Sequence, residues 1–347
     1  MKSLQRIIAV FFLVFFSHAV YAQVHDSIKA YVREALDTIR HQSLFSKKVN
    51  WQTARNKAEL QLTKAKTMLD AEAIVIEVFK QLEDNHGMYA GVDTSYKYMV
   101  PGPERIMSKS ILQQYQKQRS VKIKMLENGI AYFKMPAVLI GSDQKKMKEW
   151  ANLMMDSLCR INALKPKAYI IDLRMNNGGN SEPMWQIIKN FVGEANKTYL
   201  ADADLHIIPV KPDSAELAYQ RAAVPDSFCV LAKNILTVPV AVLTGPGTAS
   251  SGEIMALSLS TRLNTRSFGE PSIGVATATN GFIIQNKGYL LLTVNYIANA
   301  RKKVLTDKFI NPDVFVKSDT DDYENPEHDG TVLVAMKWLK GKLNAKK

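Results

Sequence analysis

The sequence predicts a mixed α/β fold, in which a helical N-terminal region precedes a largely parallel sheet with helices packed on it. Residues 26–84 contain no Pro or Gly and carry apolar residues at helical spacing. Further along, continuous apolar runs such as Ala168–Arg174 and Val238–Thr244 each lead through a Gly-containing turn into a segment with helical patterning. Alternating buried strands and helices are typical of parallel sheets that are covered by helices.

The individual elements follow from local patterns along the chain. The apolar side chains of Ala71–Leu82 form one helical stripe. Met99–Glu104 contains two prolines and a glycine and is expected to be a loop, whereas the polar, basic Lys109–Arg119 is expected to be a solvated helix or a linker. The remaining expected elements are strands at Gly129–Pro136, Ala168–Arg174, Val238–Thr244 and Tyr289–Tyr296, and helices at Asp143–Ile161, Glu182–Val192, Gly252–Arg262 and Asp329–Leu343.

Composition and charge limit the class of protein. With 347 residues, of which 46% are hydrophobic, the chain is expected to fold into globular domains. The formal net charge is +12, but the lysines and arginines are scattered, and no Arg-rich stripe interleaved with aromatic residues occurs. We therefore expect no nucleic-acid partner.

The N-terminus is expected to be a signal peptide. Lys2 and Arg6 precede the apolar run Ile7–Phe16, and Val20–Ala22 supplies a cleavage site. The run is short for a bilayer core of about 30 Å, although an uncleaved N-terminal anchor stays an alternative. No cysteine follows it to carry a lipid, and no later stretch reaches transmembrane length. We expect export to the periplasm or the medium after cleavage near Ala22, and a mature chain with no integral membrane segment.

These observations give three predicted parts: a signal peptide at residues 1–22, an N-terminal helical region at 23–125 and a core domain at 126–347. The two cysteines, Cys159 and Cys229, are too few for a disulfide-rich scaffold or a four-cysteine zinc site. Export permits one disulfide between them, but two buried thiols are an equally good interpretation of their apolar surroundings.

Three segments carry candidate chemistry. Ser250 lies in a Gly-containing turn between a strand and a helix, where unpaired N–H groups favour a developing negative charge, although Ser250 and Glu253 also fit a capping box. Gly178 and Gly179 follow Asp172-Leu-Arg-Met-Asn-Asn at a strand end, where glycine lets a backbone N–H turn toward a ligand. His86 follows the apolar helix, and the histidines are not spaced as metal ligands, so no metal or other cofactor is expected.

In this order, the three segments resemble the carboxy-terminal processing peptidases and the tricorn protease core, one family of serine peptidases. The resemblance includes Asp84-Asn-His86, the Asp172-Leu-Arg strand end with Gly178-Gly179, and Ala249-Ser250-Ser-Gly-Glu253. Gly269-Glu-Pro-Ser-Ile-Gly274 and Asn311-Pro-Asp313 continue it, so it covers about residues 70–316. It implies a crotonase/ClpP-like sheet with helices packed on it, and a polypeptide substrate.

The resemblance also implies roles for individual residues. Ser250 matches the nucleophile, and the N–H groups of Ser251 and of Gly178 or Gly179 would form the oxyanion hole. The processing branch has a lysine base after the Gly-Glu turn, but Val275 stands there, so His86 is expected to be the base, as in the tricorn-like branch.

The group that orients the histidine is less well defined by the sequence. The tricorn-like branch leads us to look for an acid at the first position of the x-Pro-Asp segment, but Asn311 stands there. Asp313, Asp307 and Asn85 are the candidates instead. Only about 40 residues separate Tyr89 from Gly129, too few for the PDZ domain that the family often carries.

Two functions follow from this resemblance. The first is an exported serine endopeptidase that uses Ser250 and His86. The alternative, raised by the missing acid at Asn311, is a catalytically inactive protein on the same fold that binds peptides or lipids. The sequence leaves the oligomeric state open.

Overall fold

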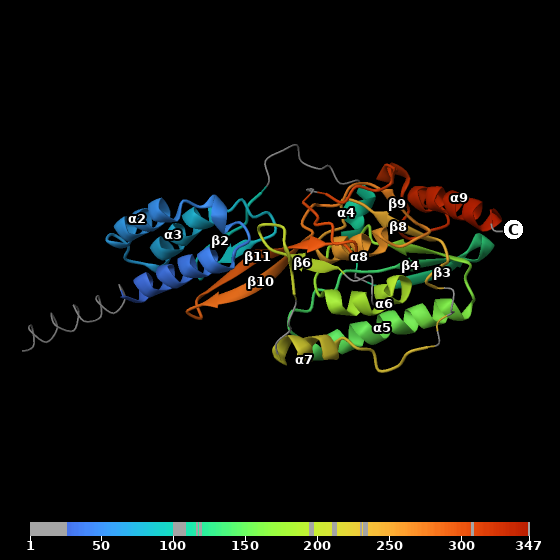
Figure 1. Ribbon diagram of the computed structural model, residues 1–347, viewed down its shortest axis with the longest axis horizontal. Helices are drawn as coiled ribbons and strands as arrows, with labels where there is room; N and C mark the ends of the chain where they lie inside the picture. The colour runs from blue at the N-terminus through green and yellow to red at the C-terminus, as the bar shows by residue number, and fades with distance from the viewer. Residues whose placement is uncertain are drawn as a thin grey trace, which may run out of the picture. The chain divides into compact units, whose positions relative to one another are not determined.

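A computed structural model describes residues 26–99, 109–115, 117, 120–193, 198–209, 214–229, 231, 235–306 and 309–345. The expected signal peptide, all of the expected loop Met99–Glu104 except Met99, and the candidate Asp307 lie outside these residues. The chain divides into two compact units (Figure 1). Among the described residues, no helix has both the length and the apolar character needed to cross a membrane.

The first unit comprises the N-terminal helices and a hairpin from much later in the chain. It contains the described residues 26–99 together with Ala278–Asn295. A helix over residues 26–42 is followed by η1 (Ser46–Lys48), α2 (Trp51–Leu62), α3 (Met68–Lys80), β1 (Met88–Ala90) and β2 (Ser95–Tyr96). The hairpin consists of β10 (Thr277–Ile284) and β11 (Gly288–Ala298), which pair with each other. The first residue of β10 and the last three residues of β11 belong to the second unit. The expected core domain, 126–347, includes this hairpin, whereas the structure groups it with the N-terminal helices.

Local signals begin the helices of this unit, and apolar packing holds them. The Asn50 side chain accepts the Thr53 N–H at 3.1 Å, and Thr67 forms a capping box with Asp70 at the start of α3. The helices and strands share one apolar core, and β1 pairs antiparallel with β11. These contacts fix the loop between α3 and β1, which carries His86.

The second unit contains a six-stranded sheet in the order β12-β9-β8-β5-β4-β3. All neighbouring strands run parallel except the edge strand β3, which is antiparallel to β4. The strands are β3 (Lys122–Leu126), β4 (Ile130–Lys134), β5 (Ala168–Asp172), β8 (Val240–Thr244), β9 (Thr265–Gly269) and β12 (Val314–Phe315). The prediction of a largely parallel sheet is confirmed.

Helices cover both faces of this sheet, which explains why its strands are continuous apolar runs. On one face, Phe133, Tyr169 and Val242 join the core formed with α5 (Gln144–Ala163), α6 (Ser181–Val192) and α8 (Ser251–Ser260). On the other face, Tyr132, Ile170 and Leu243 pack on α9 (Gly330–Asn344). The predicted helices of this unit are confirmed, with shifts of one or two residues at their ends.

Shorter elements complete the second unit. Part of the polar segment Lys109–Arg119 forms α4 (Lys109–Tyr115). The others are η2 (Glu127–Gly129), β6 (Tyr199–Ala201), β7 (Ile207–Ile208), α7 (Ser214–Ala222) and η4 (Ser318–Thr320). β6 pairs antiparallel with β7 and with the end of β11.

A disulfide joins Cys159 on α5 to Cys229, with Cα atoms 5.7 Å apart. Of the two alternatives for these cysteines, one disulfide or two buried thiols, the structure has the disulfide. The segment before Cys229 also lies along α5, because Asn152 Nδ2 donates to Asp226 Oδ2 at 2.6 Å and Lys148 Nζ donates to the Val224 carbonyl at 2.5 Å. The bridge therefore fastens the chain that follows α7 to the face of α5.

Replacing both cysteines by alanine is expected to lower the free energy of unfolding by about 4 kcal/mol, because the bridge closes a loop of 70 residues in the unfolded chain. Urea unfolding followed by circular dichroism measures this loss. Wild-type protein unfolded in the presence of a reductant should lose the same amount, and exposed Ser260→Ala serves as control. A double variant within about 1 kcal/mol of the wild type would contradict the prediction.

Candidate active site

Ser250 lies at the junction of β8 and α8 with a strained backbone. Its φ is +51° and its ψ is −121°, a conformation that residues with a side chain rarely adopt. The turn before it is held firmly, since Thr248 Oγ1 donates to the Leu173 carbonyl at 2.9 Å and the Ala249 N–H donates to the Asn176 carbonyl at 3.0 Å. The fold thus places a serine hydroxyl at a helix N-terminus, where unpaired N–H groups can stabilise negative charge.

The Gly178–Gly179 segment packs directly against Ser250. Both glycines have positive φ, at +96° and +95°. A Cβ atom at Gly178 would lie 2.7 Å from the Ser250 Cβ, and one at Gly179 would lie 2.1 Å from the Val138 carbonyl oxygen. Ser251 Oγ also donates to the Gly179 carbonyl at 2.6 Å. The structure therefore brings together four residues predicted for the site: Ser250, Ser251, Gly178 and Gly179.

The predicted oxyanion donors differ in how their N–H groups are used. The Gly178 N–H already donates to Asn176 Oδ1 at 3.0 Å. Ser251 is the first residue of α8, where a helix leaves its N–H groups without an intrahelical acceptor. The Gly179 N–H has no acceptor among the residues that the structure describes. Gly179 and Ser251 are thus better placed than Gly178 to donate to a substrate oxygen.

Glu253 is a site residue that the sequence indicates only as part of a motif. Its buried carboxylate accepts the Ser250 N–H at 2.8 Å, which is the carboxylate half of the predicted capping box. It also accepts Ser272 Oγ at 2.5 Å and the N–H groups of Gly274 and Val275 at 2.8 and 2.9 Å. Burial raises the pKa of Glu253, against these hydrogen bonds, which lower it. Glu253 fixes the serine to the turn that begins at Gly269.

His86 lies in the first unit, in the loop between α3 and β1. The buried Asp84 holds this loop: its Oδ1 accepts the N–H groups of His86 and Gly87 at 3.0 and 2.8 Å. The same carboxylate accepts the N–H and Oγ1 of Thr293, at 2.9 and 2.8 Å. The sequence indicates Asp84 only as part of the Asp-x-His pattern.

The electrostatic surroundings keep the His86 imidazole neutral. Burial lowers its pKa to about 4, an effect that Asp84 opposes and Lys97 reinforces. A histidine with this pKa is uncharged at neutral pH and can accept a proton. The structure describes Ser250 and His86 in different units, so each is placed by its own surroundings.

The orienting candidates are distributed over both units. Asp313 is exposed, and its Oδ2 accepts the N–H and Oγ of Ser267 at 2.8 and 2.9 Å, which fastens the start of β12 to β9. These contacts give Asp313 a structural task, and a catalytic one stays a prediction. Asn85 is half-buried beside His86.

The Asp172-Leu-Arg174 motif forms a buried ion-pair cluster at the end of β5. The Arg174 guanidinium binds Asp172 at 2.6 Å, Asp321 at 2.7 Å and Asp329 at 2.9 Å. Tyr132 Oη donates to Asp172 at 2.7 Å. The Arg174 cation thus holds together three carboxylates, one from β5 and two from the C-terminal segment. The sequence alone indicated no role for Arg174.

Comparisons with known proteins give the family. The model of "Peptidase family S41" matches residues 129–316, more than half of the chain. A nisin-resistance protein from Lactococcus lactis subsp. lactis is 23% identical over 291 residues, which cover 84% of each protein.

Solved structures share the fold. A lipoprotein from Streptococcus agalactiae has a TM-score of 0.65 and 22% identity, covering 91% of this chain and 96% of that one. The photosystem II D1 C-terminal processing protease has a TM-score of 0.59 and 12% identity, covering 87% and 96%. A putative peptidase from Parabacteroides merdae ATCC 43184 has a TM-score of 0.59 and 16% identity, covering 90% and 96%. With the family model spanning the strained serine, the glycine loop and the buried glutamate, the chain belongs to peptidase family S41.

Proposed function

We propose that the protein is an exported serine endopeptidase that cleaves polypeptides through an acyl-enzyme on Ser250. The observation that carries the proposal is the strained Ser250 backbone at the start of α8, packed against Gly178. A strained non-glycine residue persists only where its surroundings enforce it, and such residues cluster at active sites. A helix cap alone does not require this strain, because ordinary caps adopt extended backbone conformations.

In the proposed reaction, the neutral His86 ring takes the proton of Ser250 Oγ while the oxygen attacks the carbonyl carbon of the scissile bond. The N–H groups of Ser251 and Gly179 donate to the oxyanion. Collapse of the intermediate breaks the C–N bond, and the amine leaves with the proton from His86. His86 then takes a proton from water as the water oxygen attacks the acyl carbon. The C–Oγ bond breaks, Ser250 Oγ regains the proton from His86, and the acid product leaves. The proposal requires the two units to bring Oγ and the ring within hydrogen-bond reach, roughly 3 Å.

Asp84 acts in this proposal as a positioning residue for the backbone of the His86 loop. Asn85, Asp313 and Asp307 stay candidates for orienting the ring itself. Val275, at the position of the lysine base in the processing branch, uses its N–H to hold Glu253. An exported location is supported by the basic and apolar N-terminus and by matches to a lipoprotein and to a protein named for nisin resistance.

A fluorophosphonate probe tests the nucleophile directly. We expect the wild-type protein to be labelled, because Ser250 Oγ displaces fluoride from phosphorus, and we expect Ser250→Ala to lose the label. Ser260→Ala, at the exposed end of α8, is the matched control and should be labelled normally. Labelling that persists in Ser250→Ala contradicts the assignment, and a wild-type protein that is never labelled favours the binding-protein alternative.

The pH dependence of kcat/KM tests the base. Because burial lowers the pKa of His86 to about 4, kcat/KM should rise with pH through about 4 and be level at pH 6. Removing the nearby positive charge with Lys97→Gln is expected to move the midpoint upward. A midpoint near 6.5, the ordinary value for histidine, would contradict the environment described for His86.

A further inference from the structure

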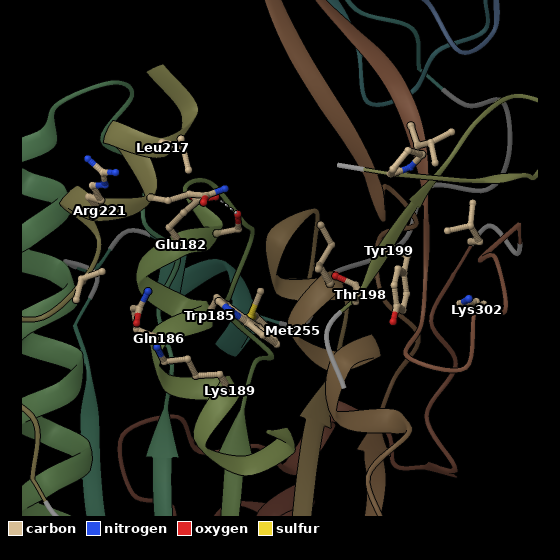
Figure 2. Close-up of a pocket in the computed structure, with 17 residues that line it drawn as sticks. Glu182, Trp185, Gln186, Lys189, Thr198, Tyr199, Leu217, Arg221, Met255 and Lys302 are labelled. Carbon is tan, nitrogen blue, oxygen red and sulfur yellow. Dashed lines mark hydrogen bonds between the residues drawn. The ribbon is translucent and has the colours of Figure 1, made fainter. Parts of the chain in front are cut away.

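A large cavity lies in the second unit, between α6, α7, the β6–β7 hairpin and the first turns of α8. Its volume is about 910 Å³, within the range of sites that bind ligands. Trp185 and Met255 both line one side, and Tyr199 stands across from them (Figure 2). Other apolar lining residues include Ile207, Ile208, Leu217 and Ile254.

This cavity begins about one helical turn along α8 from the proposed nucleophile. The Ile254 N–H donates to the Ser250 carbonyl at 3.0 Å, and Ile254 lines the cavity. On the facing helix, the lining residues Ser181 and Glu182 follow directly after Gly179 and Asn180. A helix rises about 6 Å over four residues, so a polypeptide held at Ser250 reaches the cavity with its neighbouring residues.

Positive charges predominate among the described residues that line the cavity. Lys189, Arg221 and Lys302 are cationic, and Glu182 is the one carboxylic acid among these lining residues, although the charge of Glu216 on α7 also acts on Glu182. Burial raises the pKa of Glu182, and its Oε1 accepts Ser181 Oγ at 3.1 Å. Lys302 Nζ lies 5.9 Å from the centroid of the Tyr199 ring, and Lys189 Nζ lies 5.9 Å from that of Phe228. An apolar space with a cationic margin attracts a ligand that combines apolar and acidic groups.

We propose that this cavity receives an apolar segment of the polypeptide next to the scissile bond, and that its cationic margin selects segments flanked by acidic residues. The assignment as a substrate site rests on the proposed peptidase function, whereas the binding preference itself does not require turnover.

One hydrogen-bond network connects the cavity wall to the loop beside Ser250. Tyr219 on α7 hydrogen-bonds Glu182, and its Oη also accepts the side-chain amide of Asn180. Asn180 in turn donates to the Gly141 carbonyl at 2.8 Å and accepts the Ile140 N–H at 3.3 Å. The wall formed by α7 is therefore joined to the residue that follows the proposed oxyanion donor Gly179.

Binding to the full-length Ser250→Ala protein tests the selection without turnover. The probes are two dye-labelled capped peptides, Asp-Leu-Phe-Leu-Asp and Lys-Leu-Phe-Leu-Lys, and the readout is fluorescence anisotropy. We expect the acidic peptide to bind at least about tenfold more tightly, and Arg221→Glu with Lys302→Glu to reverse the order. The matched control, Arg301→Glu, has the same change of sign at an exposed residue that is outside the cavity lining, and should keep the order.

A second variant separates the apolar contribution. Leu217→Ser, on the exposed part of the wall, is expected to weaken both peptides by a similar factor, about three- to tenfold, and to leave their ratio unchanged. Equal binding of the two peptides, a preference unaffected by the double charge reversal, or unaltered affinities in Leu217→Ser would each overturn the proposal.

The outcomes also separate this inference from the peptidase proposal. A clear acidic preference in a protein that fluorophosphonate never labels leaves the cavity site standing and removes the catalytic assignment. Labelling of Ser250 with no such preference does the opposite.

Discussion

Replacing His86 by alanine is expected to lower kcat by about 10⁴-fold, as loss of one member of a nucleophile–base pair does. The reason is that the serine hydroxyl, whose own pKa lies far above 7, then has no group to take its proton. The loss should appear in kcat, measured with an unstructured polypeptide at pH 7, rather than in binding to the cavity. Binding of the acidic peptide described above shows whether the cavity of His86→Ala still binds its ligand as the wild-type cavity does.

Two comparisons test the role of His86: whether it acts in the same step as Ser250, and whether the loss of kcat is specific to this histidine. The double variant with Ser250→Ala should be no slower than Ser250→Ala alone, because either change abolishes the same step. His41→Ala and His206→Ala, both at exposed histidines, should keep wild-type kcat. A His86→Ala protein with more than about a tenth of wild-type kcat, and an unaltered thermal transition, would exclude His86 as the base.

Arg174→Met is expected to lower the free energy of unfolding by about 3–5 kcal/mol at pH 7, since it leaves buried carboxylates without their cation. The side chain is 2% exposed and is bound by Asp172, Asp321 and Asp329. Methionine keeps much of the volume, so the loss reports charge more than packing. Urea unfolding measures it, with exposed Arg301→Met as control.

The pH dependence gives this prediction a second test. Burial raises the pKa of Asp172, but the Arg174 charge outweighs it and holds the pKa below the usual value of 3.8. In the wild-type protein, the Asp172–Arg174 interaction therefore contributes to the free energy of unfolding above pH 3.8, and this contribution is lost as pH falls further. In Arg174→Met the Asp172 carboxyl loses this charge and is expected to bind its proton at higher pH, so the difference in stability between the two proteins should shrink as pH falls from 7 toward 4. A difference that is constant with pH, or below about 1 kcal/mol at pH 7, would contradict the electrostatic explanation.

The sequence predicted what short stretches of chain determine by themselves. The parallel strands carry continuous apolar runs because both of their faces are covered, and the glycines at 178 and 179 mark a backbone that admits no Cβ. These local signals were sufficient to predict the sheet and its main helices, whereas the group formed by Ser250, Ser251 and the two glycines was implied by the resemblance to the peptidase family.

What the sequence did not predict depends on partners far away along the chain. Asp84 binds Thr293 across 209 positions, and Arg174 binds Asp329 across 155. The strands β1, β2, β6, β7 and β12 have only two or three residues, too few to show a period. The pairing of β11 with β1, which groups a late hairpin with early helices, depends on register that no local pattern reveals.

With export as proposed, the Cys159–Cys229 bridge would make completion of the cavity part of maturation. It fastens the chain just after α7, the helix that contributes Leu217, Gln220 and Arg221 to the wall. Thiols are oxidised outside the reducing cytoplasm, so a newly made chain still inside the cell would hold this wall by noncovalent contacts alone, among them the ion pair of Lys148 with Asp226 at 3.3 Å. The oxidation state of two sulfur atoms would then distinguish a precursor with a loosely held cavity wall from the oxidised protein.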